Sequence, residues 1–392
     1  MSAIALRGQS IIGIGNEGQT KTGAAELVSL CHKLLSSKGE ASDIALSFEI
    51  LSFYQNLDSD EKSGFFEALY DQFSTDLVLI DTAARAYLED PSIPNMGLLA
   101  EATEPTRRKS VIRLNQAPDA TQMLIEMRAD LLTRLARDEK LKEVDRDFSK
   151  LFTSWFNGGF LQLQKLDWSS PTTVLENIMR YEAVHGMSGW EELRKRIVQP
   201  DRLIYGFFHP RLSDEPLIFI EVAQMAEMPD QISTILDGEL PGIDPAEATT
   251  AVFFSISNCQ KGLRGVPFGS FLIKQVVQDL KDTYPHLKEY VTHSPVPGIG
   301  KWSKDPGKNQ STKSPVRLTE TAASKIETET AASKIAQMHD LDWISDIAQI
   351  DNLKPIITGA MAGYINAVKN DRMQPVDPVS RFHLGNGARL RE

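Results

Sequence analysis

The segment TTAVFFSISNCQKGLRGVPFGSFLIKQVVQDL, residues 249–280, contains the pattern from which we predict the fold of the second half of this chain. It opens with a run of apolar, β-branched and aromatic residues, which predicts a buried strand. Glycines and basic residues follow, and then apolar residues recur at helical spacing, at Ile273, Val276, Val277 and Leu280. A strand, a glycine-rich loop and a helix start bring backbone N–H groups and the positive end of a helix dipole to one point. This geometry suits phosphate, although an ordinary strand-to-helix turn has the same pattern.

The charge of this stretch differs from that of the whole chain. The 392 residues carry 42 Lys and Arg against 53 Asp and Glu, a formal net charge of −11 at pH 7. This balance argues against nucleic acid as the main partner, because phosphate backbones require a basic face. Lys261, Arg264 and Lys274 are nevertheless close in sequence, with Asp279 as the one acidic residue of the stretch. A local positive excess in an acidic protein favours a small polyanionic ligand.

Composition narrows the class of protein further. With 41% hydrophobic and 24% charged residues the sequence is typical of globular proteins, and its length allows two or three domains. It has no apolar run of about 18 residues, and its N-terminus lacks the pattern of a signal peptide. The two cysteines, Cys31 and Cys259, exclude a Cys-rich zinc site and fit a reducing compartment. We therefore expect a cytoplasmic protein with no metal and no membrane partner.

The first part of the chain has a helical period, from about residue 20 to 165. The segments AAELVSLCHKLLSS, TQMLIEMRADLLTRLARD and DFSKLFTSWFNGG carry it most clearly, each with an apolar stripe. Segments such as EDPSIPNMG separate the helices. No cluster of catalytic residue types stands out in this part, so we expect a helical bundle that serves as a scaffold or an oligomerisation surface.

The character of the sequence changes after about residue 195. DRLIYGFFHP, EPLIFIEVA and TTAVFFSISN are short apolar runs bounded by turn residues, which predict strands, and HLKEYVTHSPVPGIGKW predicts another strand that leads into a Pro/Gly-rich loop. We expect an α+β, multidomain protein. A flexible tail at 1–20 precedes an all-α helical bundle at 21–190, and a mixed α/β domain occupies 191–392.

The glycine-rich loop resembles a known pyrophosphate-binding pattern. From Arg264 to Gly269 it is similar to the R/Q-x-x-G-x-G/A loop of the GNAT acyltransferase superfamily, with Pro267 in place of the first glycine. Gln260 begins a second, overlapping version. Glycines allow an anion to approach where a Cβ would obstruct it. The resemblance implies that the loop holds the pyrophosphate of coenzyme A (CoA) through Gln260, Lys261, Gly262, Arg264, Gly265, Val266, Gly269 and Ser270.

A longer resemblance covers much of the chain. The blocks YEAVHGMSGWEELRKRI, FFHPRLSDEPLIFIEVA, AVFFSISNCQKGLRGVPFGSFLIKQVV, HSPVPGIGKW and DPVSRFHLGNGARL are similar, in this order and spacing, to the malonyl-CoA decarboxylase family. That family joins an N-terminal helical domain to a GNAT-like catalytic domain. The resemblance implies decarboxylation of malonyl-CoA to acetyl-CoA and CO2, with no cofactor because CoA is part of the substrate. It also implies a homo-oligomer formed through the helical domain and a role in fatty acid metabolism.

The resemblance assigns a catalytic pair as well. The family has a serine in a Ser-Pro-Ile/Val-Pro-Gly motif and a histidine in Phe-His-Leu-x-Asn-Gly, which correspond to Ser294 and His383. A serine hydroxyl can donate a hydrogen bond to a carboxylate or thioester oxygen, and an imidazole with an ordinary pKa near 6.5 can supply a proton to carbon. The pair can act together if the fold makes the two residues neighbours. From local sequence alone, a serine such as Ser294 is most often a turn residue, and a histidine such as His383 is more often packed or at the surface. His293 is a rival acid or base, and His209 is expected to be structural.

Two other functions are also compatible with the sequence. A GNAT-like acyltransferase would share the loop but pass the acyl group to an amine. A homologue that binds CoA esters without turnover is suggested by the ending HLGNGARLRE, because the family's domain continues for several dozen residues beyond this motif and the chain is expected to be truncated. Where some family members carry a glutamate this chain has Pro267, so a carboxylate role at this position is either absent or supplied by another residue. A near-duplication, TETAASKIE and TETAASKIA at 319–336, is too short for a repeat architecture.

Overall fold

A computed structural model gives the fold of this chain. The structure describes residues 23–37, 39–237, 242–267, 269–299, 302, 354, 357–359, 361–362, 364–365, 370 and 373–390. These residues belong to two compact units, divided after Tyr290. The predicted tail at 1–20 and the near-duplication at 319–336 lie outside the described residues. No helix in the described part of the chain is long and apolar enough to cross a membrane.

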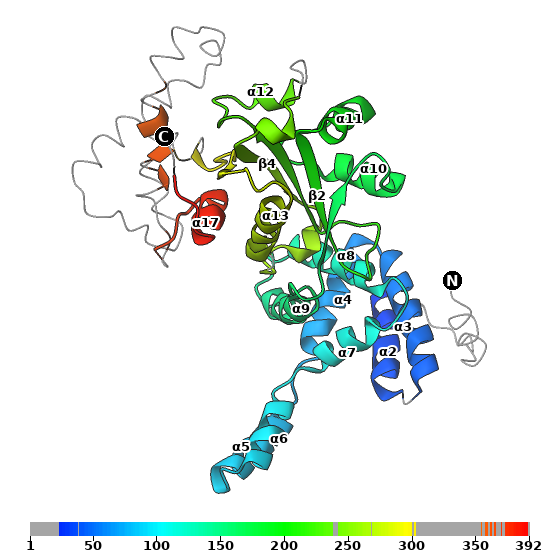
Figure 1. The fold of residues 1–392 in the computed structure, drawn as a ribbon. Helices are drawn as coiled ribbons and strands as arrows, with labels where there is room; N and C mark the ends of the chain where they lie inside the picture. The colour runs from blue at the N-terminus through cyan, green and yellow to red at the C-terminus, as the bar shows by residue number, and fades with distance from the viewer. Residues whose placement is uncertain are drawn as a thin grey trace. The chain divides into compact units, whose positions relative to one another are not determined.

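The first unit begins with a helical bundle, drawn in blue and cyan in Figure 1. The predicted apolar stripes form its core: Leu27, Cys31 and Leu34 of the first helix are fully buried, and Leu124 and Leu131 are buried in the same way. The prediction of an all-α bundle is therefore confirmed. Its helices are α2 (Gly23–Ser36), α3 (Glu40–Gln55), α4 (Ser59–Asp71), α5 (Leu77–Glu89), α6 (Ile93–Ala102), α7 (Thr106–Leu114), α8 (Ala120–Leu132) and α9 (Leu141–Trp155).

A sheet follows the bundle, and its strands lie side by side in chain order. β1 to β4 pair antiparallel, and the register shifts between Glu221 and Val222, where β3 meets β4. The four strands predicted from the sequence are confirmed as β2 to β5. The strands are β1 (Gln162–Leu166), β2 (Arg202–Phe208), β3 (Ile218–Met225), β4 (Thr250–Asn258) and β5 (Glu289–Thr292).

β1 differs from the prediction, because it lies within the range that was predicted to be helical. Its sequence QLQKL has three polar residues and a largely solvent-accessible pattern of burial. Such a strand has no local signal of its own. It exists because β2 offers it an antiparallel partner, from the pair Gln162–Phe208 to the pair Leu166–Ile204. The pairing is a tertiary contact, which the spacing of apolar residues does not predict.

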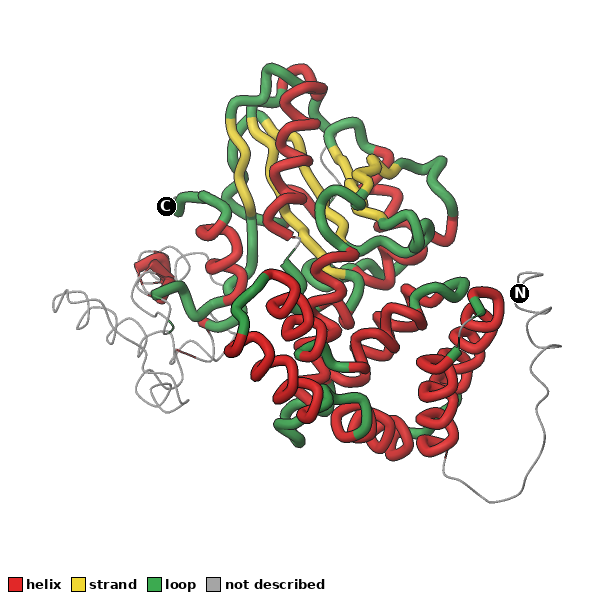
Figure 2. Tube along the Cα trace, turned by 90° about the horizontal axis from the view of Figure 1, so that it is seen from below, coloured by secondary structure: helices red, strands yellow, loops and turns green. Residues whose placement is uncertain are grey.

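The sheet is covered on both faces, as Figures 1 and 2 show. Successive residues of β2 point to opposite faces: Leu203 and Tyr205 join the core that contains α13 (Gly269–Thr283), whereas Ile204 and Phe208 pack with α10 (Thr172–Tyr181) and α11 (Trp190–Val198). β2, β3 and β4 are buried over nearly their whole length. The mixed α/β domain predicted to follow the bundle is therefore present. Short helices α12 (Ser233–Leu236) and η1 (Pro245–Glu247) lie between β3 and β4.

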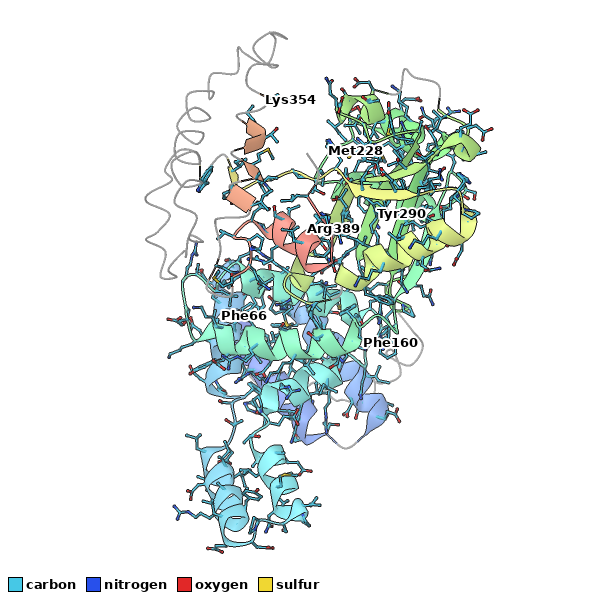
Figure 3. All side chains as sticks on the ribbon, turned by 60° about the vertical axis from the view of Figure 1, so that its left-hand side comes forward. Phe66, Phe160, Met228, Tyr290, Lys354 and Arg389 are labelled. Atoms are coloured by element: carbon cyan, nitrogen blue, oxygen red, sulfur yellow. The ribbon has the colours of Figure 1, made fainter. Side chains whose placement is uncertain are left out.

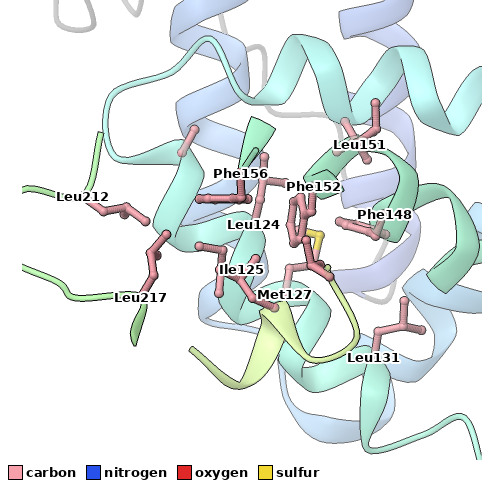
Figure 4. Close-up of a cluster of buried hydrophobic side chains, with 14 of the residues drawn as sticks. Leu124, Ile125, Met127, Leu131, Phe148, Leu151, Phe152, Phe156, Leu212 and Leu217 are labelled. Atoms are coloured by element: carbon pink, nitrogen blue, oxygen red, sulfur yellow. The ribbon is translucent and has the colours of Figure 1, made fainter. Parts of the chain in front are cut away.

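The bundle and the sheet share one hydrophobic core. Figure 4 shows Leu212 and Leu217, from the loop between β2 and β3, on the same cluster as Leu124 and Ile125 of α8. In this loop His209 is buried, accepts a hydrogen bond from the backbone N–H of Arg211 at Nδ1 (3.2 Å) and packs on Phe156, and burial lowers its pKa. The predicted structural role of His209 is confirmed. Since the core is continuous, a domain boundary at residue 190 stays a prediction.

A helical hairpin, α5 and α6, projects from the bundle (Figure 1). Its base is closed where the N–H of Arg107 donates to the carbonyl of Phe73 at 2.9 Å. Neither helix has a buried residue. Figure 3 shows the hairpin apart from the part of the bundle that contains Phe66, with side chains around both of its helices. Many of these exposed side chains are large and apolar: Leu77, Val78, Leu79, Leu88, Ile93, Met96 and Leu98.

Candidate functional site

Ser294 and His383 meet in the second unit, although 89 positions of sequence separate them. Ser294 Oγ lies 3.0 Å from His383 Nε2, which is hydrogen-bond distance. Both side chains are half-buried. Burial lowers the pKa of His383 below its ordinary value of 6.5, so the neutral imidazole is favoured near neutral pH. The fold thus meets the condition for joint action, that the two residues are neighbours, and their roles in catalysis stay a prediction.

Asp377 joins the helix that carries His383 to the loop after β5 that carries Ser294, the Ser294 loop. It is the N-cap of α17 (Pro378–Gly385), the helix that carries His383, and its Oδ1 accepts from the N–H of Ser380 at 2.8 Å. Its Oδ2 accepts from the N–H of Gly298, in the Ser294 loop, at 3.2 Å. Only 1% of Asp377 is exposed. Asp377 was not predicted from the sequence, although an Asp before a Pro at the first helical position is a recognised start signal.

A small hydrophobic core supports the same loop. Trp302, Tyr364 and Ile365 are its buried members, and Val296, Ile299 and Leu384 pack against it. A Cβ built on Gly298 would overlap Tyr364 Oη. The glycine of the Ser-Pro-Val-Pro-Gly segment is thus required by close packing between the loop and Tyr364, and not by its backbone conformation.

The glycine-rich loop lies in the first unit, between β4 and α13. η2 (Lys261–Leu263) forms its first turn, and Gly265 has φ +82°, a conformation that favours glycine. Lys261 and Arg264 are exposed, while Val266 is buried in the core. Two other residues predicted to bind the pyrophosphate, Gly262 and Gln260, contact other parts of the protein. Gly262 packs against α8, and the side chain of Gln260 donates to Glu215 Oε2 and to the carbonyl of Pro216, both at 3.3 Å.

Part of the loop backbone is committed to the loop itself. The N–H groups of Leu263, Arg264 and Val266 donate to carbonyls three residues earlier in the chain. A phosphate would therefore meet the side chains of Lys261 and Arg264 and the N–H groups of the first turn of α13, which begins at Gly269. The side chain of Ser270 lies outside the described part of the structure.

A buried polar cluster lies beneath the end of β4. The carboxylate of Glu182 accepts from Ser255 and Ser257 of β4, at 2.8 and 3.2 Å, and from the N–H of His185 at 2.7 Å. Beside it, Glu221 of β3 is fully buried and accepts from Arg196 Nη1 at 3.2 Å. Burial first, and the neighbouring Glu182, raise the pKa of Glu221 to about 8. This cluster was not predicted from the sequence, because its members come from separate elements.

Comparisons with known proteins agree with one another. The family described as "Malonyl-CoA decarboxylase C-terminal domain" matches residues 159–392, and "Malonyl-CoA decarboxylase N-terminal domain" matches residues 73–156. The chain is 31% identical to the mitochondrial malonyl-CoA decarboxylase of Anser anser anser over 73% of this chain and 59% of that protein. The mitochondrial enzyme of Rattus norvegicus is also 31% identical, over 74% and 61%. The chain thus spans about three fifths of the length of these curated relatives.

Solved structures give a closer match. The crystal structure of malonyl-CoA decarboxylase from Rhodopseudomonas palustris is 46% identical, with a TM-score of 0.82 over 94% of this chain and 86% of that chain. The corresponding structure from Agrobacterium vitis is 44% identical, with a TM-score of 0.81 and the same coverage. Sequence and fold therefore place the chain among the same relatives.

We expect Gly298→Ala to lower the free energy of unfolding by about 1–3 kcal/mol, because its Cβ would overpack the loop against Tyr364. Tyr364→Phe removes the overlapping oxygen, so the double variant should recover part of this loss. Chemical denaturation of the single and double variants measures both effects. Gly359→Ala is the matched control, since its Cβ would meet no atom of the described residues within 4 Å. Unchanged stability in Gly298→Ala would contradict the packing argument.

Proposed function

We propose, because the chain belongs to the malonyl-CoA decarboxylase family, that it converts malonyl-CoA to acetyl-CoA and CO2. The observation that carries the proposal is the hydrogen bond between Ser294 and His383 in a chain of this family. Loss of CO2 from a malonyl thioester sends two electrons into the thioester carbonyl and produces an enolate. The enzyme must stabilise the enolate oxygen and then protonate carbon, which requires hydrogen-bond donors and one proton source.

Ser294 is the donor and His383 is the residue that replenishes its proton. In the neutral imidazole, Nε2–H donates to Ser294 Oγ, and the serine hydroxyl is then directed to the substrate oxygen. After CO2 departs, Ser294 Oγ–H gives its proton to the α-carbon, and His383 Nε2–H returns a proton to Oγ. Nδ1 takes up a proton from solvent, and proton exchange with solvent then moves the ring proton from Nδ1 back to Nε2. The neutral Nε2–H tautomer is restored, and one solvent proton is consumed per turnover. The lowered pKa of His383 supports this neutral relay.

The glycine-rich loop is proposed to hold the pyrophosphate of the CoA moiety. Two exposed cations, Lys261 and Arg264, and the start of α13 support this role, as does the likeness of the loop to the GNAT pattern. CoA is the part of the substrate that this loop binds, so the proposed reaction needs no separate cofactor. Both cysteines are free, buried thiols, which supports a reducing compartment, and we propose the cytoplasm.

We also propose that the chain forms a homo-oligomer through the α5–α6 hairpin. Each helix of the hairpin carries large apolar side chains that the rest of its own unit does not cover; Leu88 is 80% and Ile93 is 81% exposed. An apolar surface of this kind on a projecting element is typical of a protein interface. Two hairpins related by a twofold axis would cover each other's apolar side chains, because such an interface uses the same surface twice.

Incubation of the purified chain with malonyl-CoA should yield acetyl-CoA, followed by mass, and CO2, which can be trapped, in equal amounts. Ser294→Ala and His383→Ala should each lower the rate by roughly 10²–10⁴-fold, because each breaks the proton relay. A His293→Ala variant serves as the control and should keep most of the activity. Acyl transfer to an added amine without CO2, or intact malonyl-CoA with folded protein, would contradict the proposal.

The pH dependence of kcat/KM should report the neutral form of His383. Because burial lowers the pKa of this imidazole, kcat/KM should be constant near neutral pH and fall as the pH drops through a value below 6.5. His383→Gln should lack this acidic limb. A rate that falls instead as the pH rises from about 6 to about 8 would identify the imidazolium as the proton donor.

Substitution of Leu88 and Ile93 together by Glu should shift the chain to a smaller assembly, because charge opposes burial of the hairpin. Light scattering during size-exclusion chromatography measures the mass. Val198→Glu, at an apolar residue of α11 that is 51% exposed, is the control and should leave the assembly unchanged. A monomeric wild-type chain would contradict the oligomer proposal.

A further inference from the structure

The helical bundle contacts the glycine-rich loop at its first turn. α8 packs directly against η2, and the carbonyl oxygen of Ile125 lies so close to Gly262 that a Cβ at that position would overlap it. Figure 4 shows the part of α8 that carries Ile125 and Met127. A glycine here serves the close approach of two backbones. The contact therefore fixes the distance between the bundle and the start of the loop.

Arg128, on the same helix, completes this contact. Its side chain is 2% exposed, and its Nη1 donates to the carbonyl of Gly262 at 2.6 Å. Its Nε donates to Asp145 of α9 at 2.8 Å, and the guanidinium lies 5.9 Å from the ring centroid of Phe152. A planar guanidinium held by a carboxylate and an aromatic ring has little freedom. It therefore holds the Gly262 carbonyl in one direction.

That direction determines the course of the loop. Because the peptide unit is planar, a Gly262 carbonyl aimed at Arg128 turns the N–H of Leu263 the opposite way. This N–H donates to the carbonyl of Gln260 at 3.0 Å, and the next one, of Arg264, donates to Lys261 at 3.2 Å. The turn leaves Lys261 and Arg264 exposed. Arg128 thus sets the turn that presents both cations.

We infer that Arg128 is a positioning residue for the binding of the CoA phosphates. The inference rests on the proposed function, in which the loop holds the pyrophosphate. It gives the helical bundle a part in substrate binding, through a residue that acts on the loop and not on the substrate. Loss of the guanidinium would release the Gly262 carbonyl and leave a buried acceptor without its donor.

Arg128→Met tests the inference with two substrates. Its KM for malonyl-CoA and its Kd for CoA, measured by calorimetry, should each rise about tenfold, because the loop loses a hydrogen bond to a charged donor. With malonyl-pantetheine, which has the thioester but no phosphate, kcat/KM should stay within about twofold of the wild type. A purely structural role would lower the activity with both substrates alike, and that outcome would overturn the inference.

Arg107→Met is the matched control. Arg107 is also a buried arginine of the bundle, 7% exposed, and its Nε donates to Asp147 at 2.6 Å. Its loss should lower the thermal stability, yet KM and Kd should not change. A similar rise of KM in Arg107→Met would overturn the inference.

Two further outcomes separate this inference from the proposed function. If the wild-type chain does not bind CoA, the phosphate role of the loop fails, and the inference fails with it. If the wild type binds CoA and Arg128→Met binds it equally well, the inference alone fails. Should Arg128→Met not fold, Arg128→Lys decides the question. Its ammonium can pair with Asp145 but lacks the guanidinium fork that reaches both groups, so an unchanged KM would overturn the inference.

Discussion

The sheet of this protein is buried on both faces, and much of the first unit follows from that constraint. β2, β3 and β4 pack against α13 and the bundle on one side and against α10 and α11 on the other. A polar side chain inside such a sheet must find a partner, because an unpaired one costs several kcal/mol. Glu182 satisfies the hydroxyls of Ser255 and Ser257 in this way, and Arg196 pairs with Glu221. The polar cluster is thus a consequence of placing β3 and β4 at the centre.

The same burial determines how the loop after β4 is held. The core of the sheet continues into the bundle, so the chain leaves β4 directly against α8. Gly262 fits there because it has no Cβ, and Arg128 takes its carbonyl. In the second unit one buried carboxylate has a comparable effect: Asp377 starts α17 and holds the Ser294 loop. In both places one buried side chain forms a hydrogen bond with a backbone group, and the same bond positions a candidate site.

Local patterns were enough for much of the fold. The apolar stripes of α2, α8 and α9 and the alternating or continuous apolar runs of β2 to β4 predict elements that the structure contains, because both periods record which side of an element is buried. β1 escaped prediction because it is polar and depends on its partner strand. The sequence also did not predict that residue 262 is a glycine because it packs against α8. A glycine in a loop looks the same in sequence whether it admits an anion or another helix.

The sequence alone therefore determined the succession of a helical bundle and an α/β domain, the family of the chain and the two residues of the catalytic proposal. Only the tertiary structure brought Ser294 within 3.0 Å of His383, assigned Asp377 to both sides of that pair, and set Arg128 against the loop. The physical reason is how far apart along the chain the interacting residues lie. Periodicity and caps act within one element, whereas these contacts join residues that meet only after the elements have packed, so no spacing along the chain encodes them.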